Sequence, residues 1–308
     1  MLKAGDLLHH RYRLDTPLAR GSMGVVWKGT DRHLGRPIAV KVVHTSDSGE
    51  DHSRLVARFQ REATAAALLN HPNIAGVHDA GTAENGICWL VMQLIDGTTV
   101  DHLLSERGPF TVPAAAAVAS QVCAGLAEAH KQQLVHRDLK LANLMVDRAG
   151  LVKILDFGLV KLLVKQGTPL TVTGENVGNV LYASPELICA DNALDGRSDL
   201  YAIGCLLHHL LSGNPPFAAE PQPLLAGQHL LREPPTLADC GVEVPPPLQA
   251  LILALLAKKP DRRPHSAAAV HRALAEYVPS PRTLGAVSGI ASPEDPCRPF
   301  LFPFAPLP

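Results

Sequence analysis

The sequence predicts an α+β protein built as two lobes. Residues 10 to about 95 contain short runs of β-branched residues bounded by turn residues, together with one stretch at helical spacing. From about residue 98 onward, helical patterns dominate. The 308 residues are enough for two lobes that each bury a substantial core.

The first lobe is expected to contain strands and one helix. The expected strands are 25–29, 38–43 and 87–94. Residues 52–69 are expected to form the helix, because Phe59, Glu62 and Ala66 recur at helical spacing. This helix should end before Pro72, since proline disfavours helical backbone in the residue that precedes it.

The second lobe is expected to be mainly helical. One expected helix begins at Pro113, and three others cover 200–211, 248–258 and 266–277. Ser266 is the expected N-cap of the last one. Residues 279–308 contain eight prolines and no helical period, so we expect a mostly irregular C-terminal tail.

Composition excludes several classes of protein. The net charge of −1 gives no field that would attract nucleic acid or an anionic membrane. No apolar run reaches the roughly 18 residues of a membrane helix, and no signal peptide begins the sequence. The six cysteines have neither metal nor redox spacing, which favours free thiols in a reducing compartment. We therefore expect a cytoplasmic protein without nucleic-acid partners and without a membrane span.

Two polar segments contain the groups that phosphoryl transfer from a nucleotide requires. They are His136-Arg137-Asp138-Leu139-Lys140-Leu141-Ala142-Asn143 and Asp156-Phe157-Gly158. Asp138 is the candidate base for a hydroxyl proton, and Lys140 would stabilise charge on the moving phosphoryl group. Asn143 and Asp156 are candidate Mg²⁺ ligands, because this hard ion prefers oxygen donors.

A glycine-containing loop between two expected strands is a candidate phosphate cradle. Leu18 to Val26 contains Gly21 and Gly24, and glycine lets backbone N–H groups approach phosphates closely. Lys41, at the end of the next strand, could clamp phosphates as a point charge. Glu62 on the expected helix is its candidate ion-pair partner; a solvated charged face is the alternative interpretation.

Residues 10–277 resemble the bacterial branch of the eukaryotic-type serine/threonine protein kinases. Arg58-Phe59-Gln60-Arg61-Glu62-Ala63 and His71-Pro72-Asn73-Ile74 are typical of that branch. The resemblance implies a bilobal protein-kinase-like fold over 10–278. Its small lobe, about 10–95, would hold an antiparallel β-sheet and one helix, and its larger lobe, about 96–278, would be mainly α-helical.

The resemblance also implies ATP as cosubstrate, with Mg²⁺ or Mn²⁺. Met92 would be the gatekeeper beside adenine, 93–95 would form the hinge, and Val26, Ala39 and Met145 would enclose the ring. The full expected nucleotide set is Leu18, Ala19, Gly21, Ser22, Gly24, Val26, Ala39, Lys41, Glu62, Met92, Gln93, Leu94, Ile95 and Met145. The apolar members could equally be simple core, which is compatible with lining a nucleotide pocket.

The segment after Asp156 resembles a kinase activation segment. By resemblance, Thr171 and Thr173 are candidate phosphorylation sites, and Arg137 could pair with such a phosphate. The alternative is an unmodified polar loop.

Other residues have structural roles implied by the resemblance. His136 would pack on Phe157 rather than act in catalysis. Asp199 would cap the backbone of the catalytic loop, and Glu186 would pair with Arg263.

Three residues depart from the family pattern. Ala19 and Leu141 stand where a glycine and a proline are usual, and Leu141 is expected to loosen its loop slightly. Asn179 replaces a threonine whose hydroxyl bridges the catalytic Asp and Lys, and its side chain offers a different donor geometry.

The resemblance thus implies an ATP-dependent serine/threonine protein kinase that acts on protein hydroxyls, phosphorylates its own activation segment and forms a transient homodimer. The alternative is a nucleotide-binding pseudokinase scaffold. A small-molecule kinase is disfavoured by the Arg137–Asp138 pair and by Ser184-Pro185-Glu186.

Overall fold

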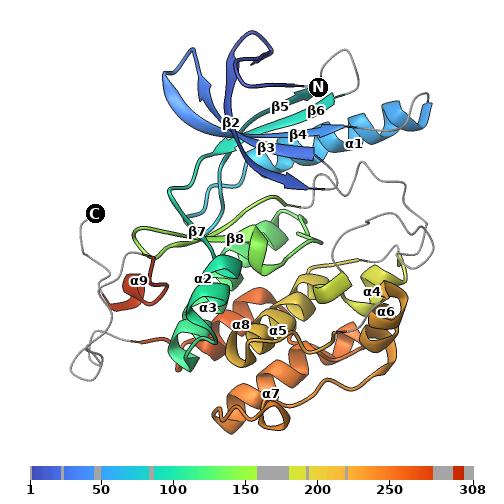
Figure 1. Cartoon of the computed structure of the whole chain (residues 1–308). Coiled ribbons are helices and arrows are strands. Elements are labelled where there is room, and N and C mark those ends of the chain that lie inside the picture. The colour runs from blue at the N-terminus through green and yellow to red at the C-terminus, as the bar shows by residue number, and fades with distance from the viewer. Residues whose placement is uncertain are drawn as a thin grey trace. The chain divides into compact units, whose positions relative to one another are not determined.

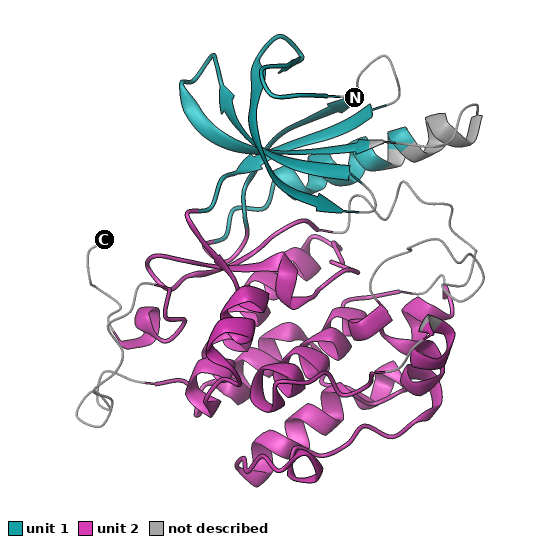
Figure 2. Ribbon diagram, viewed as in Figure 1, with its two compact units in different colours: residues 1–71, 75–95, 158–166 teal, residues 72–74, 96–157, 167–308 magenta. Residues whose placement is uncertain are grey.

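A computed structural model describes residues 2–21, 24–44, 50–82, 87–157, 180–191, 194–218, 221–279 and 294–301. The chain divides into two compact units (Figure 2). Unit 1 comprises residues up to 71 and 75–95. Unit 2 comprises residues 72–74, 96–157 and the described residues from 180 onward.

Unit 1 contains an antiparallel sheet with the strand order β1-β2-β3-β4-β6-β5 and one helix beside it (Figure 1). The strands are β1 Leu7–Leu8, β2 Tyr12–Gly21, β3 Gly24–Asp31, β4 Arg36–His44, β5 Val77–Thr82 and β6 Ile87–Gln93. The helix is α1 Glu50–Ala67. The predicted strands and helix are confirmed here.

Both faces of this sheet carry buried side chains. Successive side chains of a strand point to opposite faces, so β4 contributes to both. On one face, Ala39 and Val43 of β4 pack with Phe59 and Ala63 of α1. On the other face, β4 contributes to a second cluster. That cluster contains Tyr12, Leu14, Trp27, Ile38, Val40, Val42, Trp89 and Val91.

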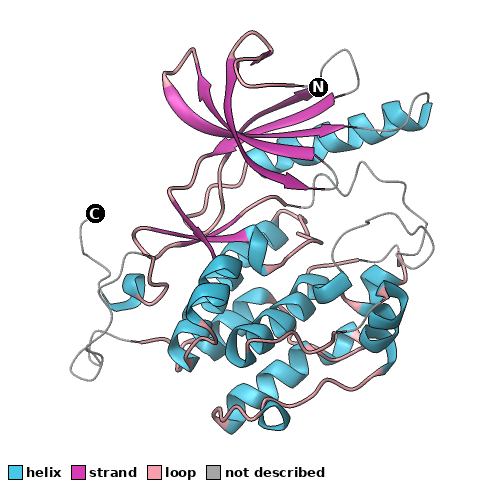
Figure 3. Cartoon of the chain, viewed as in Figure 1, coloured by secondary structure: helices cyan, strands magenta, loops and turns pink. Residues whose placement is uncertain are grey.

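Unit 2 is mainly helical and contains one small antiparallel sheet (Figure 3). Its strands are β7 Gly97–Thr99, β8 Leu144–Asp147 and β9 Val152–Ile154. Its α-helices are α2 Val100–Arg107, α3 Val112–Lys131, α4 Pro185–Ile188, α5 Arg197–Ser212, α6 Gln222–Leu231, α7 Pro246–Leu255, α8 Ala267–Leu274 and α9 Arg298–Leu301. Its 3₁₀ helices are η1 Leu141–Asn143, η3 Val180–Tyr182, η4 Ala238–Cys240 and η5 Pro260–Arg262.

Helix α3 forms the centre of unit 2 and contacts α5, α8 and β9. Within the described residues it is also the one helix long and apolar enough to cross a membrane by length and composition. This corrects the expectation that no such run exists, since its alanines raise the hydropathy without adding bulk. Buried residues make up 67% of that window, as in the core helix of a globular unit.

Two helices are shorter than expected, and the tail contains an additional element. Helix α7 ends at Leu255, three residues early, and Pro260 then begins a 3₁₀ turn. Helix α8 ends at Leu274, and its predicted cap is confirmed, since Ser266 Oγ accepts from Ala269 N–H at 3.2 Å. Within the expected irregular tail, residues 294–301 are ordered and include α9.

Candidate active site

The catalytic loop of unit 2 gathers two side chains on the carboxylate of Asp138. The amide Nδ2 of Asn143 donates to the backbone oxygen of Asp138 at 2.8 Å and to its Oδ2 at 3.2 Å. Lys140 Nζ lies 3.4 Å from the same Oδ2. The 3₁₀ helix η1 places Lys140 and Asn143 on one side of the loop. The candidate base is therefore oriented by an amide and faced by a cation.

Two non-glycine residues of this loop system have left-handed backbone. Arg137 has φ +62° and Asp156 has φ +59°. Such conformations cost on the order of 1–3 kcal/mol and persist only where the surroundings impose them. Arg137 directly precedes the candidate base Asp138, and Asp156 is itself a candidate metal ligand, so both conformations fall within the candidate site.

As predicted, the carboxylate of Asp199 caps the backbone of the first of these turns, at His136 and Arg137. Its Oδ2 accepts from the N–H of His136 at 2.9 Å, and its Oδ1 accepts from the N–H of Arg137 at 3.0 Å. The His130 ring contacts the same carboxylate at 2.8 Å. Burial alone would raise the pKa of Asp199, but the hydrogen bond and charge of His130 bring it below its ordinary value.

His136 connects the two polar segments that carry Asp138 and Asp156. Its ring lies 5.1 Å from the ring of Phe157, as predicted. Its Nε2 lies 2.9 Å from the carbonyl oxygen of Leu155, so Nε2 carries the proton. The other nitrogen, Nδ1, then accepts from the N–H of Asp138 at 3.3 Å. One buried ring thus fixes Asp138 relative to the residue before Asp156.

The donor set of unit 2 fits a divalent metal ion. Because Nδ2 of Asn143 is turned toward Asp138, its carbonyl oxygen Oδ1 is the atom that could coordinate a cation. Asp156 follows strand β9 and contributes a carboxylate. An amide oxygen and a carboxylate are ligands of the kind that Mg²⁺ takes beside nucleotide phosphates.

In unit 1, the glycine loop joins β2 to β3, and its glycines are unequal. Gly24 has φ +154°, and a Cβ there would overlap the carbonyl oxygen of Val42 on β4. A Cβ on Gly21 would meet nothing within 4 Å. Ala19 pairs with Val26 across the strands and is exposed. The sheet therefore requires glycine at 24, whereas 21 is open. Ser22 lies outside the described residues.

Lys41 lies on β4 in register with Val26 and Leu90. It shares a strand face with Ala39, the face that packs on α1. Glu62 lies on α1 and is half-buried like Lys41. The pairing of these two charges stays a prediction.

The expected hinge follows β6 at the end of unit 1. Met92 is buried, and the N–H of Gln93 donates to the carbonyl oxygen of Gly76 at 2.8 Å. Leu94 and Ile95 are half-buried. Met145, expected on the other side of adenine, lies on β8 of unit 2 opposite Thr99 of β7.

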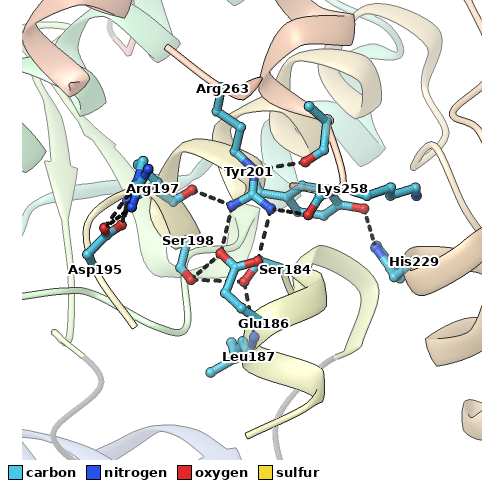
Figure 4. A network of polar contacts seen from close by, with 11 residues as sticks. Ser184, Glu186, Leu187, Asp195, Arg197, Ser198, Tyr201, His229, Lys258 and Arg263 are labelled. Carbon is cyan, nitrogen blue, oxygen red and sulfur yellow. Dashed lines mark hydrogen bonds and ion pairs between the residues drawn. The ribbon is translucent and has the colours of Figure 1, made fainter. Parts of the chain in front are cut away.

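Arg263 forms the predicted ion pair with Glu186 at the centre of a polar network (Figure 4). Ser198 also donates to Glu186, at 2.6 Å, and contacts Ser184 at 3.0 Å. The ring of Tyr201 packs against the guanidinium of Arg263, with the ring centroid 5.0 Å from Cζ. The network ties α4 to α5 and to the residue directly after η5.

Leu141 stands in the loop between Asp138 and Asn143. Its side chain is fully buried and anchors the loop in the core of unit 2, while the slight loosening expected from the missing proline stays a prediction. Thr171, Thr173 and Asn179 lie outside the described residues. Sequence reasoning missed Ser198 and Gln121, because a single polar residue in a helix gives no local signal of its distant partners.

Comparison with known proteins agrees with this arrangement. Residues 12–274 match the family described as protein kinase domain. The serine/threonine-protein kinase PknB of Mycolicibacterium smegmatis is 38% identical over 264 residues, which are 85% of this chain and 42% of that protein. The serine/threonine-protein kinase pkn3 of Myxococcus xanthus is 38% identical over 274 residues, 86% of this chain and 49% of that protein. The chain belongs to the protein kinase family and spans about half or less of the length of these relatives.

Proposed function

We propose that this chain is a serine/threonine protein kinase that transfers the γ-phosphoryl group of ATP to protein hydroxyls. The observation that carries the proposal is the convergence of Asn143 and Lys140 on Asp138. In this arrangement the carboxylate of Asp138 orients a substrate hydroxyl and accepts its proton, while Lys140 faces the phosphoryl group. The names of the bacterial relatives support serine and threonine as acceptors.

ATP would bring the phosphoryl group, and Mg²⁺ or Mn²⁺ held by Asn143 and Asp156 would neutralise charge on its phosphates. In unit 1, Lys41 and the backbone around Gly24 would bind phosphate oxygens, and the hinge residues 93–95 would contact adenine through backbone groups. Self-phosphorylation at Thr171 or Thr173, with Arg137 as partner of the phosphate, belongs to the same proposal.

A cytoplasmic location and a transient homodimer are also proposed. Free thiols at all six cysteines, four of them buried, support a reducing compartment. Sedimentation velocity across a concentration series tests the dimer, and a single monomer boundary at every concentration would exclude it.

Incubation of the purified protein with ATP and Mg²⁺, followed by phosphosite mapping, tests the kinase activity. Asp138→Asn is the matched control. We expect phosphate on Thr171 or Thr173 in the parent only. ATP binding without phosphate in either protein would overturn the activity and favour a nucleotide-binding pseudokinase scaffold.

A further inference from the structure

The C-terminal strap, residues 294–301, packs against the core of unit 2. Cys297 and Leu301 are 4% and 2% exposed and form a cluster with the fully buried Ala117 of α3. Phe300 and Val278 cover the edge of this cluster. Cys297 directly precedes α9, and its carbonyl oxygen accepts from the N–H of Leu301 at 3.1 Å, so the two side chains lie one helical turn apart on the same side. The strap therefore buries apolar surface that unit 2 would otherwise expose.

A buried amide connects the strap to the sheet of unit 2. Gln121 of α3 donates through Nε2 to the carbonyl oxygens of Pro296, at 3.1 Å, and Gly150, at 3.2 Å. Its Oε1 accepts from Asn73 Nδ2 at 3.0 Å and from Val152 N–H at 2.9 Å. All four hydrogen-bonding positions of this amide are used, and one of them requires the strap. Without the strap, a donor in a residue only 5% exposed would lose its acceptor.

The turn between β8 and β9 is shaped for the strap. Gly150 has φ +82°, and a Cβ there would overlap the carbonyl oxygen of Asp295 and lie 2.9 Å from Cβ of Arg298. Glycine is therefore needed both for the backbone conformation and for the close approach. Glu294 adds a bond to the neighbouring strand, since Thr98 Oγ1 of β7 donates to its Oε1 at 2.9 Å.

The strap thus contacts the strand before β8 and the turn after it, and β8 is the strand that carries Met145. Strand β7 begins two residues after Ile95, the last expected hinge residue, and Thr98 and Thr99 pair with Val146 and Met145 of β8. A shift of β7 would move Met145, because the two strands are hydrogen-bonded.

From these contacts we infer that residues 294–301 belong functionally to the kinase domain. They position strands β7 and β8 for nucleotide binding. Glu294 of the strap and Gln121 of α3 are the positioning residues, since they make the hydrogen bonds between the strap and the rest of unit 2. The inference rests on the proposed function, since it assigns a second determinant of nucleotide affinity to the same site. It also places the functional end of the domain beyond residue 274, where the family match ends.

Cysteine alkylation measures whether the strap is docked. In the full chain, iodoacetamide should label the exposed Cys240 quickly and the buried Cys297 at least about tenfold more slowly. Leu301→Lys places a charge in the apolar cluster and should release the strap. Leu231→Lys is the matched control, because that leucine is 85% exposed.

We expect Leu301→Lys to bring Cys297 labelling close to that of Cys240 and to weaken ADP binding about fivefold. Leu231→Lys should change neither quantity. Thr98→Val removes one hydroxyl without disturbing the core, and it should weaken ADP binding about two- to fivefold with unchanged melting temperature. This second variant keeps the test valid if Leu301→Lys unfolds.

Two results would overturn the inference. One is a Cys297 that reacts as fast as Cys240 in the parent. The other is ADP affinity that stays unchanged in both variants. ADP binding that responds to the strap in a protein without phosphoryl transfer would overturn the proposed function alone. A parent that binds no ADP would overturn the positioning role together with the proposed function.

Discussion

Arg263 and Glu186, 77 residues apart in the chain, form a two-pronged ion pair with N–O distances of 2.6 and 2.9 Å. The remaining guanidinium donors are also used. They reach the backbone oxygens of Ala257, Lys258 and Arg197 at 2.8, 3.1 and 2.8 Å. All five N–H groups of this arginine therefore have acceptors. Its side chain is fully buried, so these contacts are shielded from water.

Arg263→Met should destabilise unit 2 strongly. The carboxylate of Glu186 would lose its cation and three carbonyl oxygens would each lose a donor, a loss of roughly 3–5 kcal/mol for a broken buried pair. Arg197→Met is the matched control, since its pair with Asp195 is exposed and should contribute less than about 1 kcal/mol. Urea unfolding of both variants measures the difference. Equal losses in the two variants would contradict the central role of Arg263.

Acid should lower the free energy of unfolding by protonating the carboxylate of Glu186. Burial acts to raise the pKa of this carboxyl, but the hydrogen bonds from Arg263 and Ser198 bring it below the ordinary 4.5. A lowered folded-state pKa contributes stability above pH 4.5, and that contribution is lost as the pH falls through the folded value.

The measurement is the free energy of unfolding between pH 7 and pH 3, for the parent and for Glu186→Gln. The variant should be less stable at pH 7, and its stability should fall less below pH 4.5. Curves that run parallel over the whole range would show that this carboxyl contributes nothing to the acid response.

The two glycines of the nucleotide loop should respond differently to a methyl group. Gly24→Ala must displace the backbone at Val42 and also strains φ, so we expect a loss of about 1–3 kcal/mol and weaker nucleotide binding. Gly21→Ala enters open space and should change stability by less than about 0.5 kcal/mol. Thermal unfolding with and without ADP tests both. A Gly24→Ala variant as stable as the parent would contradict the close approach to β4.

Asn143→Ala should impair both metal binding and the orientation of Asp138. The variant lacks a candidate ligand and the donor to the Asp138 carboxylate. We expect the Mg²⁺ concentration for half-maximal activity to rise about 10–100-fold. Asn214→Ala, which changes an exposed asparagine, should leave the Mg²⁺ requirement unaltered. An unchanged requirement in Asn143→Ala would assign the metal to other residues.

Local patterns predicted the elements well where the signal is short-range. Ser266 begins α8 as a helix cap, and the β-branched run before Lys41 forms a central strand, because both depend on neighbouring residues. Asp199 and the Glu186–Arg263 pair could be predicted only through resemblance to a family, since their partners lie more than 60 residues away.

The docked strap could not be predicted by either route. It lies in a segment with eight prolines and no period, and its helix has only four residues. Its order comes from partners far along the chain, such as Gln121, 175 residues before Pro296. Local composition reflects only the prolines and therefore predicts an irregular tail.

The left-handed backbone of Arg137 and Asp156 has an evolutionary consequence. Glycine would adopt both conformations without strain, so the two side chains persist at the expense of stability. A descendant that had lost phosphoryl transfer could accept glycine at either position and fold more securely. We therefore expect glycine at 137 or 156 to accompany the loss of phosphoryl transfer in a relative of this chain.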